Sequence, residues 1–237
     1  LAMQIFLTHG RGIDQKEFSA VARDQLARYP GFLGIQWAPR VRADAREAWE
    51  KAEAASLGSV GRIRERARDG TDVAALTRPD YFPILLVEPY ESNRHVVGSD
   101  AVASPLRPSF AAAETSGSLA MSGMLKLVYE TGSNDGVVMV CPVSKSGGGS
   151  GSRAELSGFI LGVFRVADLL AQPWTHVPGT SLDVMFIDES ATRPDRRMLY
   201  CHRVNAGSQV PTEQEFRRTA DRSVSLPVAR RNWTIMY

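Results

Sequence analysis

Apolar positions recur with two different periods in the first third of the chain. Between residues 14 and 29 they lie three or four positions apart behind Asp14, which predicts a helix with an aspartate at its N-cap. From residue 33 to residue 37 they alternate with other residues, which predicts a strand. Alanine, arginine and glutamate dominate the next two stretches, and two further helices are predicted there, at residues 44–55 and 59–68.

A run of bulky apolar residues, YFPILLVEP, follows at residues 81–89. It predicts a buried strand that ends at Glu88 and is bounded by Pro83 and Pro89. A buried charge without a partner is costly. The Glu88 carboxylate is therefore either a surface group or a salt-bridge partner of Arg94 at the strand end, or an acceptor placed inside a pocket.

The second half of the chain predicts two groups of antiparallel strands, each preceded by a helix. The first group follows a helix at residues 105–114, includes the flexible linker SKSGGGSGS, and consists of strands at residues 119–130, 137–143 and 155–164. The second group follows a helix at residues 166–172 and consists of strands at residues 181–190, 196–204, 221–229 and 232–237. This order predicts an α+β fold of two modules in series, because a Rossmann sheet would need repeated βαβ units.

Composition excludes several classes of protein. The 237 residues are 43% hydrophobic and 23% charged, which is ordinary for a globular chain. A formal net charge of +2 without a concentrated basic face argues against binding to nucleic acid. No apolar run is long enough to span a bilayer, so any membrane attachment would come from segments outside this chain.

Residues that could carry catalysis or bind metal are scattered. The histidines show no HExxH spacing, no GxSxG motif is present, and Asp183 and Asp188 alternate with an apolar strand, which predicts that both lie off its core face. Cys141 and Cys201 lie in apolar strand-like runs and are predicted to be buried thiols, although their spacing does not decide whether they pair. We therefore predict no catalytic residue, no metal site and no cofactor.

Several segments, taken in order, resemble the CHASE family of extracytoplasmic sensing domains, which are attached to histidine kinases, cyclases and related signalling proteins and include the sensor of plant cytokinin receptors. The resemblance covers residues 18–164. It is carried by YPGFLGIQWAPRV, REAWE, YFPILLVEPYESN, the Gly98-Ser99-Asp100 turn, MSGMLKLVYE, CPV and SGFILGVF.

The resemblance implies a long N-terminal helical stalk followed by two PAS-like antiparallel-sheet modules. We place the stalk at residues 1–32, a membrane-distal ligand-binding module at residues 33–170 and a membrane-proximal module at residues 171–237. In the receptor relatives an acidic residue near the end of the YFPILLVEP-like strand binds the ligand, and Glu88 is the nearest match. Ser122 matches a hydroxyl residue of the next strand, and Tyr81 and the stretch from Gly158 to Gly162 match pocket-lining positions.

The residues themselves support part of this site. Gly158 and Gly162 interrupt a bulky strand, where glycine often marks the close approach of a ligand or of another backbone. For Ser122 the alternative is a small residue in a bulge beside Gly123. Leu86 and its neighbours would supply apolar walls. The predicted ligand-binding residues are Tyr81, Leu86, Glu88, Ser122, Gly158 and Gly162.

The resulting hypothesis is a non-catalytic sensor on the periplasmic or extracellular face of the membrane, within a receptor of the histidine-kinase, diguanylate-cyclase or phosphodiesterase type. The expected ligand is small, flat or apolar, and carries an N–H or O–H donor for Glu88, as adenine-type compounds and small aromatic molecules do. Apolar residues of the N-terminal segment, Ile5, Phe6, Phe18 and Leu26, predict a homodimer of the full-length protein. The rival hypothesis is an adhesion or interaction module of the same fold that binds no small molecule.

Overall fold

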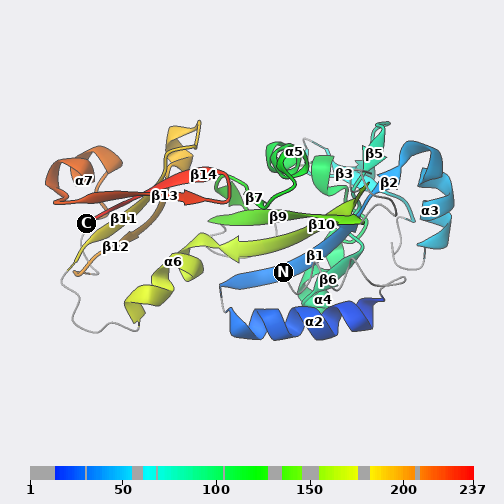
Figure 1. Ribbon diagram of the computed structural model, residues 1–237, viewed down its shortest axis with the longest axis horizontal. Coiled ribbons are helices and arrows are strands. Elements are labelled where there is room, and N and C mark those ends of the chain that lie inside the picture. Colours follow the sequence, from blue (N-terminus) through cyan, green and yellow to red (C-terminus); the bar gives the residue numbers. More distant parts are fainter. Residues whose placement is uncertain are drawn as a thin grey trace, which may run out of the picture.

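The computed structural model describes residues 14–29, 31–54, 61–67, 69–103, 105–127, 135–145, 155–175, 182–205 and 209–237. Two antiparallel sheets lie one after the other along the longest axis of the molecule (Figure 1). The predicted α+β class with two groups of antiparallel strands is confirmed. Most of the linker SKSGGGSGS lies outside the described residues.

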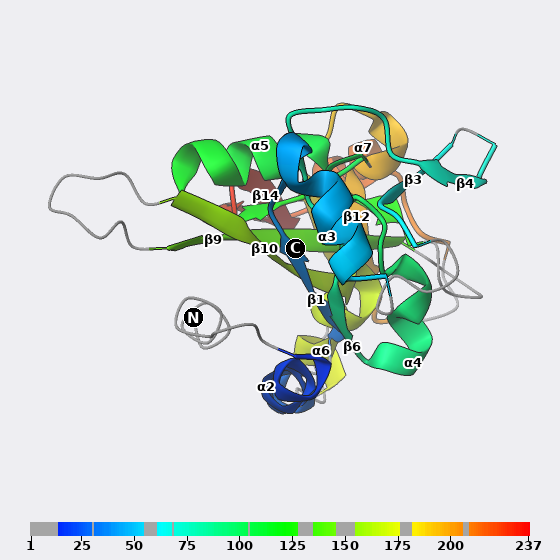
Figure 2. The same cartoon turned by 90° about the vertical axis from the view of Figure 1, so that its right-hand side faces the viewer.

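The larger sheet, called here the large sheet, is built around two long strands that pair along most of their length. Its strands in spatial order are β6 (Leu86–Glu88), β1 (Phe32–Pro39), β10 (Glu155–Arg165), β9 (Asp135–Lys145) and β7 (Ala120–Met121), and β8 (Leu125–Lys126) also pairs with β9. Helix α2 (Gln15–Arg28) covers one face and helix α5 (Arg107–Ser116) covers the other (Figure 2). We refer to these as the α2 face and the α5 face.

The α5 face is filled by a continuous apolar core. Phe82, Phe110 and Phe159 meet at its centre, where the Phe159 ring lies 4.8 Å from the ring of each of the other two. The turns between residues 94 and 103 cover part of this face and include the 3-10 helices Arg94–Val96 and Ala101–Ala103, which follow the short helix α4 (Tyr90–Asn93). The core of the large sheet is therefore packed with side chains beneath α5.

The predicted long stalk is wrong for the described residues. Helix α2 spans only 14 residues, begins at the predicted cap Asp14, whose Oδ1 accepts a hydrogen bond from the Glu17 amide at 2.8 Å, and lies along the large sheet. Its apolar stripe is used there, because Phe18 and Ala22 are fully buried against β1, β6 and β10. Phe18 is thus not available to a second copy of the chain, and Ile5 and Phe6 lie outside the described residues.

The helix predicted at residues 59–68 is also wrong where the structure describes it. Residues 64–66 form strand β3 (Arg64–Arg66), which pairs with β4 (Asp72–Ala74). Tertiary contacts override the helical composition here: the Arg64 amide donates to the Gly98 carbonyl, the Arg64 carbonyl accepts from the Asp100 amide, and Ile63 is fully buried. The preceding helix is shorter than predicted, with a 3-10 turn at Ala43–Ala45 and α3 at Arg46–Ala52.

The run YFPILLVEP is divided between two sheets. Its first residue lies in β5 (Asp80–Tyr81), which pairs with β2 (Val41–Arg42), and only Leu86–Glu88 joins the large sheet. Pro83 lacks an amide hydrogen, and the Ile84 amide and carbonyl bond with Ser99 and Gly98 instead of with a neighbouring strand. Backbone pairing therefore changes partner within the run.

The smaller sheet, called here the small sheet, contains the four strands predicted after residue 180. Its spatial order is β12 (Met198–His202), β11 (Val184–Asp188), β14 (Arg231–Met236) and β13 (Ser223–Val228). Helix α7 (Glu213–Thr219) packs on one face through Phe216, and helix α6 (Val166–Thr175) leads into this unit from β10. A 3-10 turn at Pro194–Arg196 connects β11 to β12.

One apolar cluster joins the two sheets, and we call it the junction core. It combines residues of both sheets and of α6: Met121, Val137, Phe164, Val166, Leu170, Val184, Phe186, Leu199 and Trp233. Polar contacts surround it. The Met121 amide donates to the Ala229 carbonyl at 2.9 Å, and Arg196 Nη1 donates to Asp135 Oδ1 at 2.9 Å. The two sheets are therefore connected by packing as well as by the chain.

Asp188 lies at this junction and corrects a prediction. It was expected off the core face, but its side chain is only 1% exposed and pairs with Arg231 Nη2 at 2.6 Å. The reason is that β11 is a central strand buried on both faces, between α7 and the junction core, so strand alternation does not lead to solvent. The Arg231 guanidinium also lies close to Gly123, where a Cβ would be 3.2 Å from Arg231 Nη2.

Candidate ligand-binding sites

Glu88 is buried on the α2 face at the end of β6. Its side chain is 6% exposed, and Oε1 accepts a hydrogen bond from Arg23 Nε of helix α2 at 2.8 Å. The other carboxylate oxygen, Oε2, is buried and has no hydrogen-bond partner among the described residues. The salt-bridge partner is thus Arg23 rather than Arg94, and the carboxylate links helix α2 to the large sheet.

Protein atoms fill the gaps that the two glycines of β10 leave. A Cβ at Gly158 would lie 2.6 Å from the Trp37 ring and 2.9 Å from Pro39, and a Cβ at Gly162 would lie 2.8 Å from the Phe32 ring. Both positions pair with β1. Of the two explanations for glycine in a strand, the structure shows the close approach of other parts of the same chain.

Ser122 and Tyr81 lie away from Glu88. Ser122 follows β7, and its Oγ accepts a hydrogen bond from the Val138 amide at 2.9 Å beside the core under α5. Tyr81 is fully buried in a separate cluster, where its hydroxyl accepts hydrogen bonds from Arg46 Nη1 at 3.1 Å and from the Arg78 amide at 3.2 Å. The structure therefore groups Leu86 and Glu88 on the α2 face and separates them from Ser122 and Tyr81.

Asp100 is a buried carboxylate that sequence reasoning did not select. Oδ1 accepts hydrogen bonds from the Phe82 amide at 3.0 Å and the Val102 amide at 3.3 Å, and Oδ2 accepts one from Arg78 Nη1 at 3.0 Å. Burial raises the pKa of Asp100, while these hydrogen bonds and the Arg78 charge act in the opposite direction. The carboxylate holds the Gly98-Ser99-Asp100 turn at the edge of the core under α5. The turn was part of the resembling sequence, but its burial depends on distant residues.

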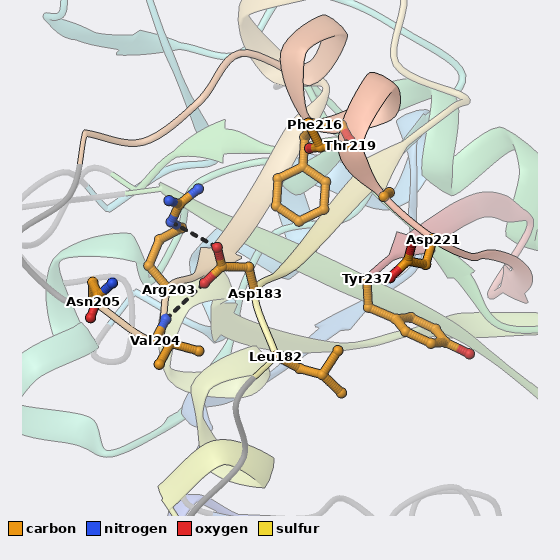
Figure 3. Close-up of a pocket in the computed structure, with 10 residues that line it drawn as sticks. Leu182, Asp183, Arg203, Val204, Asn205, Phe216, Thr219, Asp221 and Tyr237 are labelled. Carbon is orange, nitrogen blue, oxygen red and sulfur yellow. Dashed lines mark hydrogen bonds and ion pairs between the residues drawn. The ribbon is translucent and has the colours of Figure 1, made fainter.

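A pocket of about 360 Å³ opens at the far end of the small sheet, and we call it the end pocket (Figure 3). Its lining comes from the start of β11, the end of β12, the end of α7 and Tyr237: Leu182, Asp183, Arg203, Val204, Asn205, Phe216, Thr219, Ala220, Asp221 and Tyr237. Sequence reasoning missed this pocket because its residues are distributed over 56 positions, from Leu182 to Tyr237, and share no motif.

Other chemistry is limited in the part of the chain that the structure describes. No group of three or more histidine, cysteine, aspartate or glutamate side chains there could hold a metal ion. Cys141 and Cys201 are half-buried, lie in different sheets and form no disulfide. None of the described helices is both long and apolar enough to cross a bilayer.

The sequence matches the CHASE domain over residues 11–200, which is most of the chain. The chain belongs to the CHASE family. The match begins just before α2 and ends within β12, so it includes the whole large sheet and the first part of the small sheet. This CHASE domain is accordingly a sensor domain of the type found in signal-transduction receptors.

A curated relative points to the same kind of protein. The hybrid signal transduction histidine kinase A of Dictyostelium discoideum is 29% identical over 103 residues, which are 40% of this chain but only 5% of that protein. The CHASE domain thus corresponds to a small part of the relative, and the catalytic part of such a receptor is not represented in the matched segment.

Two solved structures share the fold. An extracellular ligand-binding receptor from Desulfohalobium retbaense DSM5692 has a TM-score of 0.56 at 11% identity, over 100% of this chain and 35% of that one. The ligand-binding domain of the amino-acid chemoreceptor PctC of Pseudomonas aeruginosa PAO1, in complex with GABA, has a TM-score of 0.50 at 13% identity, over 100% of this chain and 86% of that one. At these identities the likeness shows a common fold.

Proposed function

We propose that this CHASE domain is the extracytoplasmic sensor of a membrane-bound receptor whose output domain is a histidine kinase, a diguanylate cyclase or a phosphodiesterase. We further propose that the domain binds a small molecule in the large-sheet unit. The observation that carries the proposal is the family match over residues 11–200, which spans that unit completely. The catalytic part and the membrane-spanning segments belong to regions outside the chain. In this arrangement the large-sheet unit is membrane-distal and the small-sheet unit is membrane-proximal.

The junction core supports transmission between the two units. A ligand that moves β7, β9 or β10 acts directly on the small sheet, since Met121, Val137 and Phe164 pack in the same cluster as Phe186 and Trp233. Packed cores move between discrete arrangements rather than deform continuously. Binding in the large-sheet unit therefore changes the position of the small sheet, which leads toward the membrane.

The six predicted site residues remain a proposal, and their arrangement defines two alternatives. A ligand on the α2 face would contact Leu86 and Glu88 and would need α2 to move, because Arg23 occupies the carboxylate. A ligand under α5 would contact Ser122 and would need to displace packed aromatic side chains. The oxygens of the Glu88 carboxylate accept hydrogen bonds, which favours a ligand with an N–H or O–H donor. The PctC domain binds GABA, so amino acids join adenine-type and small aromatic compounds as candidates.

A thermal-shift screen of these three compound classes on the whole chain tests the proposal. Ligand at a hundred times its dissociation constant stabilises a protein by about 2.7 kcal/mol, which is readily measured. Any compound that raises Tm is then titrated against Glu88→Ala, Ser122→Ala and the control Asp24→Ala, which removes an exposed carboxylate of α2. We expect Glu88→Ala or Ser122→Ala to weaken binding by about tenfold or more, and the control to leave it unchanged.

The outcomes separate the alternatives. Loss of binding only in Glu88→Ala places the ligand on the α2 face, and loss only in Ser122→Ala places it under α5. If no compound stabilises the chain, the rival function as an interaction module gains support from the filled core of the large sheet. We further propose that the full-length receptor is a homodimer, which cross-linking in membranes would test.

A further inference from the structure

The end pocket has a charged group on each side and apolar groups between them. In Figure 3 Arg203 and Asp183 lie on one side, Asp221 and Tyr237 lie on the other, and Phe216 and Leu182 lie between. Its volume of about 360 Å³ falls at the lower end of the range of small-molecule sites, about 300–1,000 Å³. The pocket is large enough for a compound the size of a short amino acid.

Arg203 forms one ion pair with the described residues, through Nε, and that buried nitrogen makes no hydrogen bond. Asp183 Oδ2 lies 3.2 Å from Arg203 Nε, while Asp183 Oδ1 accepts a hydrogen bond from the Val204 amide at 2.8 Å. The Arg203 side chain is 26% exposed, and within the described residues its terminal nitrogens Nη1 and Nη2 make no hydrogen bond. A half-buried guanidinium with two open donors is suited to bind a carboxylate with two parallel hydrogen bonds.

Asp221 provides the opposite charge. Its side chain is exposed and makes no ion pair or hydrogen bond with the rest of the described chain. A simple anion would be attracted by Arg203 but repelled by Asp183 and Asp221, and a simple amine would leave the Arg203 donors open. A zwitterion satisfies both ends of the pocket.

We propose that the end pocket is a second binding site, which takes a small zwitterion with its carboxylate on Arg203 and its ammonium on Asp221. Phe216, in the middle of α7, and Leu182 contact the aliphatic part of the zwitterion. Because the pocket joins β11, β12, α7 and Tyr237, a bound zwitterion fixes these elements relative to one another. The site lies in the unit opposite the one proposed for the primary ligand, so the receptor would read two chemical inputs.

A homologous series of unbranched amino acids measures both the charges and their spacing. Glycine, 3-aminopropanoate, 4-aminobutanoate and 6-aminohexanoate are titrated into the whole chain by calorimetry, with butanoate and butylamine as single-charge controls. Amide chemical shifts of Val204 and Ala220 report the end pocket, and those of Val87 and Val138 report the large sheet. We expect one chain length to bind best, both single-charge controls to bind at least tenfold more weakly, and the shifts to concentrate at Val204 and Ala220.

Substitutions of pocket residues provide a second test of the proposed site. Arg203→Gln should weaken binding of the best amino acid by about ten- to a hundredfold, and Asp221→Asn, at an exposed position, by about two- to fivefold. The control Arg218→Gln removes an exposed cation of α7 outside the pocket and should have no effect. Asp221→Asn keeps the test valid if Arg203→Gln disturbs folding.

Contrary results are distinguishable from failure of the sensor proposal. Absence of binding across the series, or equal binding by butanoate, overturns the proposed zwitterion site. Neither result contradicts the proposal that a ligand binds in the large-sheet unit. Binding that shifts Val87 or Val138 and survives Arg203→Gln also overturns the second site, while it supports the sensor proposal.

Discussion

At the scale of single residues, Glu88 is a buried carboxylate with an incomplete set of partners. Arg23 satisfies Oε1 but is itself 72% exposed, and Oε2 is buried without a hydrogen bond among the described residues. A buried acceptor without a partner costs about 1–3 kcal/mol. The ion pair offsets little of this cost, because the exposed Arg23 guanidinium is solvated by water whether or not it contacts Glu88. The position is therefore destabilising by itself, which is common for groups kept for function.

Glu88→Met should raise the free energy of unfolding by about 1 kcal/mol, because methionine keeps the volume and removes the unsatisfied oxygen. Urea denaturation followed by circular dichroism measures the change. Asp24→Asn, which removes an exposed carboxylate of α2 next to Arg23, serves as the control and should change stability by less than about 0.5 kcal/mol. A loss of more than about 1 kcal/mol in Glu88→Met would mean that Oε2 has a partner in solution and that the carboxylate is a structural group.

At the scale of elements, charges attach α7 to the small sheet. Arg197 Nε and Nη2 donate to Glu213 at 2.9 Å each, and Arg197 and Arg217 both also bond Glu189. The hydrogen bonds from Arg197 lower the pKa of Glu213 from 4.5 to about 2. The unfolded chain therefore takes up a proton on Glu213 at higher pH than the folded chain. This contribution to stability is complete above about pH 4.5 and is lost as the pH falls toward about 2.

Arg197→Gln should destabilise the chain at about pH 6, and the difference from wild type should become smaller as the pH approaches 3. The reason is that the pKa of Glu213 returns toward its ordinary value when its main donor is removed. Urea denaturation at a series of pH values gives the profile. The control Arg218→Gln removes an arginine that has no described ion pair from α7, the helix that carries Glu213, and the stability of this variant should run parallel to that of wild type at every pH. A difference that is independent of pH would show that Arg197 acts through packing alone.

At the scale of the whole molecule, the junction core makes the two sheets one cooperative unit. Phe164 lies at the end of β10. Its ring is tilted against the Phe32 ring, with the centroids 4.0 Å apart, and packs in the cluster that includes Trp233 of the small sheet. Phe110 is buried to a similar degree but belongs to the core under α5, within the large sheet. Substitution of Phe110 therefore tests the stability of the large-sheet unit alone, whereas substitution of Phe164 also tests the coupling between the two units.

Scanning calorimetry of the wild-type chain should show a single transition. Phe164→Ala should cost about 3–5 kcal/mol and split it in two, because the lost contacts connect the sheets. Phe110→Ala should cost a similar amount and keep a single transition at lower temperature. Two transitions in the wild type, or one in both variants, would contradict the coupling on which transmission through the junction depends.

The sequence by itself determined what depends on local periodicity. The helix behind Asp14, the long strands around Ile160, the four strands after residue 180 and the α+β class all follow from apolar spacing and turn residues, and family membership follows from the order of short segments. Glu88 could be proposed as a site residue from the sequence, because it is a charged residue at the end of an apolar run. Its partner could not, since Arg23 lies 65 positions away.

Tertiary structure decided everything that depends on distant partners. Residues 64–66 form a strand because their backbone pairs with residues 72–74 and with the turn at Gly98, against a helical composition. Asp188 is buried because β11 is central, which strand alternation cannot reveal. The glycines of β10 accommodate Trp37 and Phe32, and the end pocket gathers residues from four separate segments. Local patterns specify elements, whereas burial and charge pairing arise only when those elements pack, because each needs a partner supplied by another part of the chain.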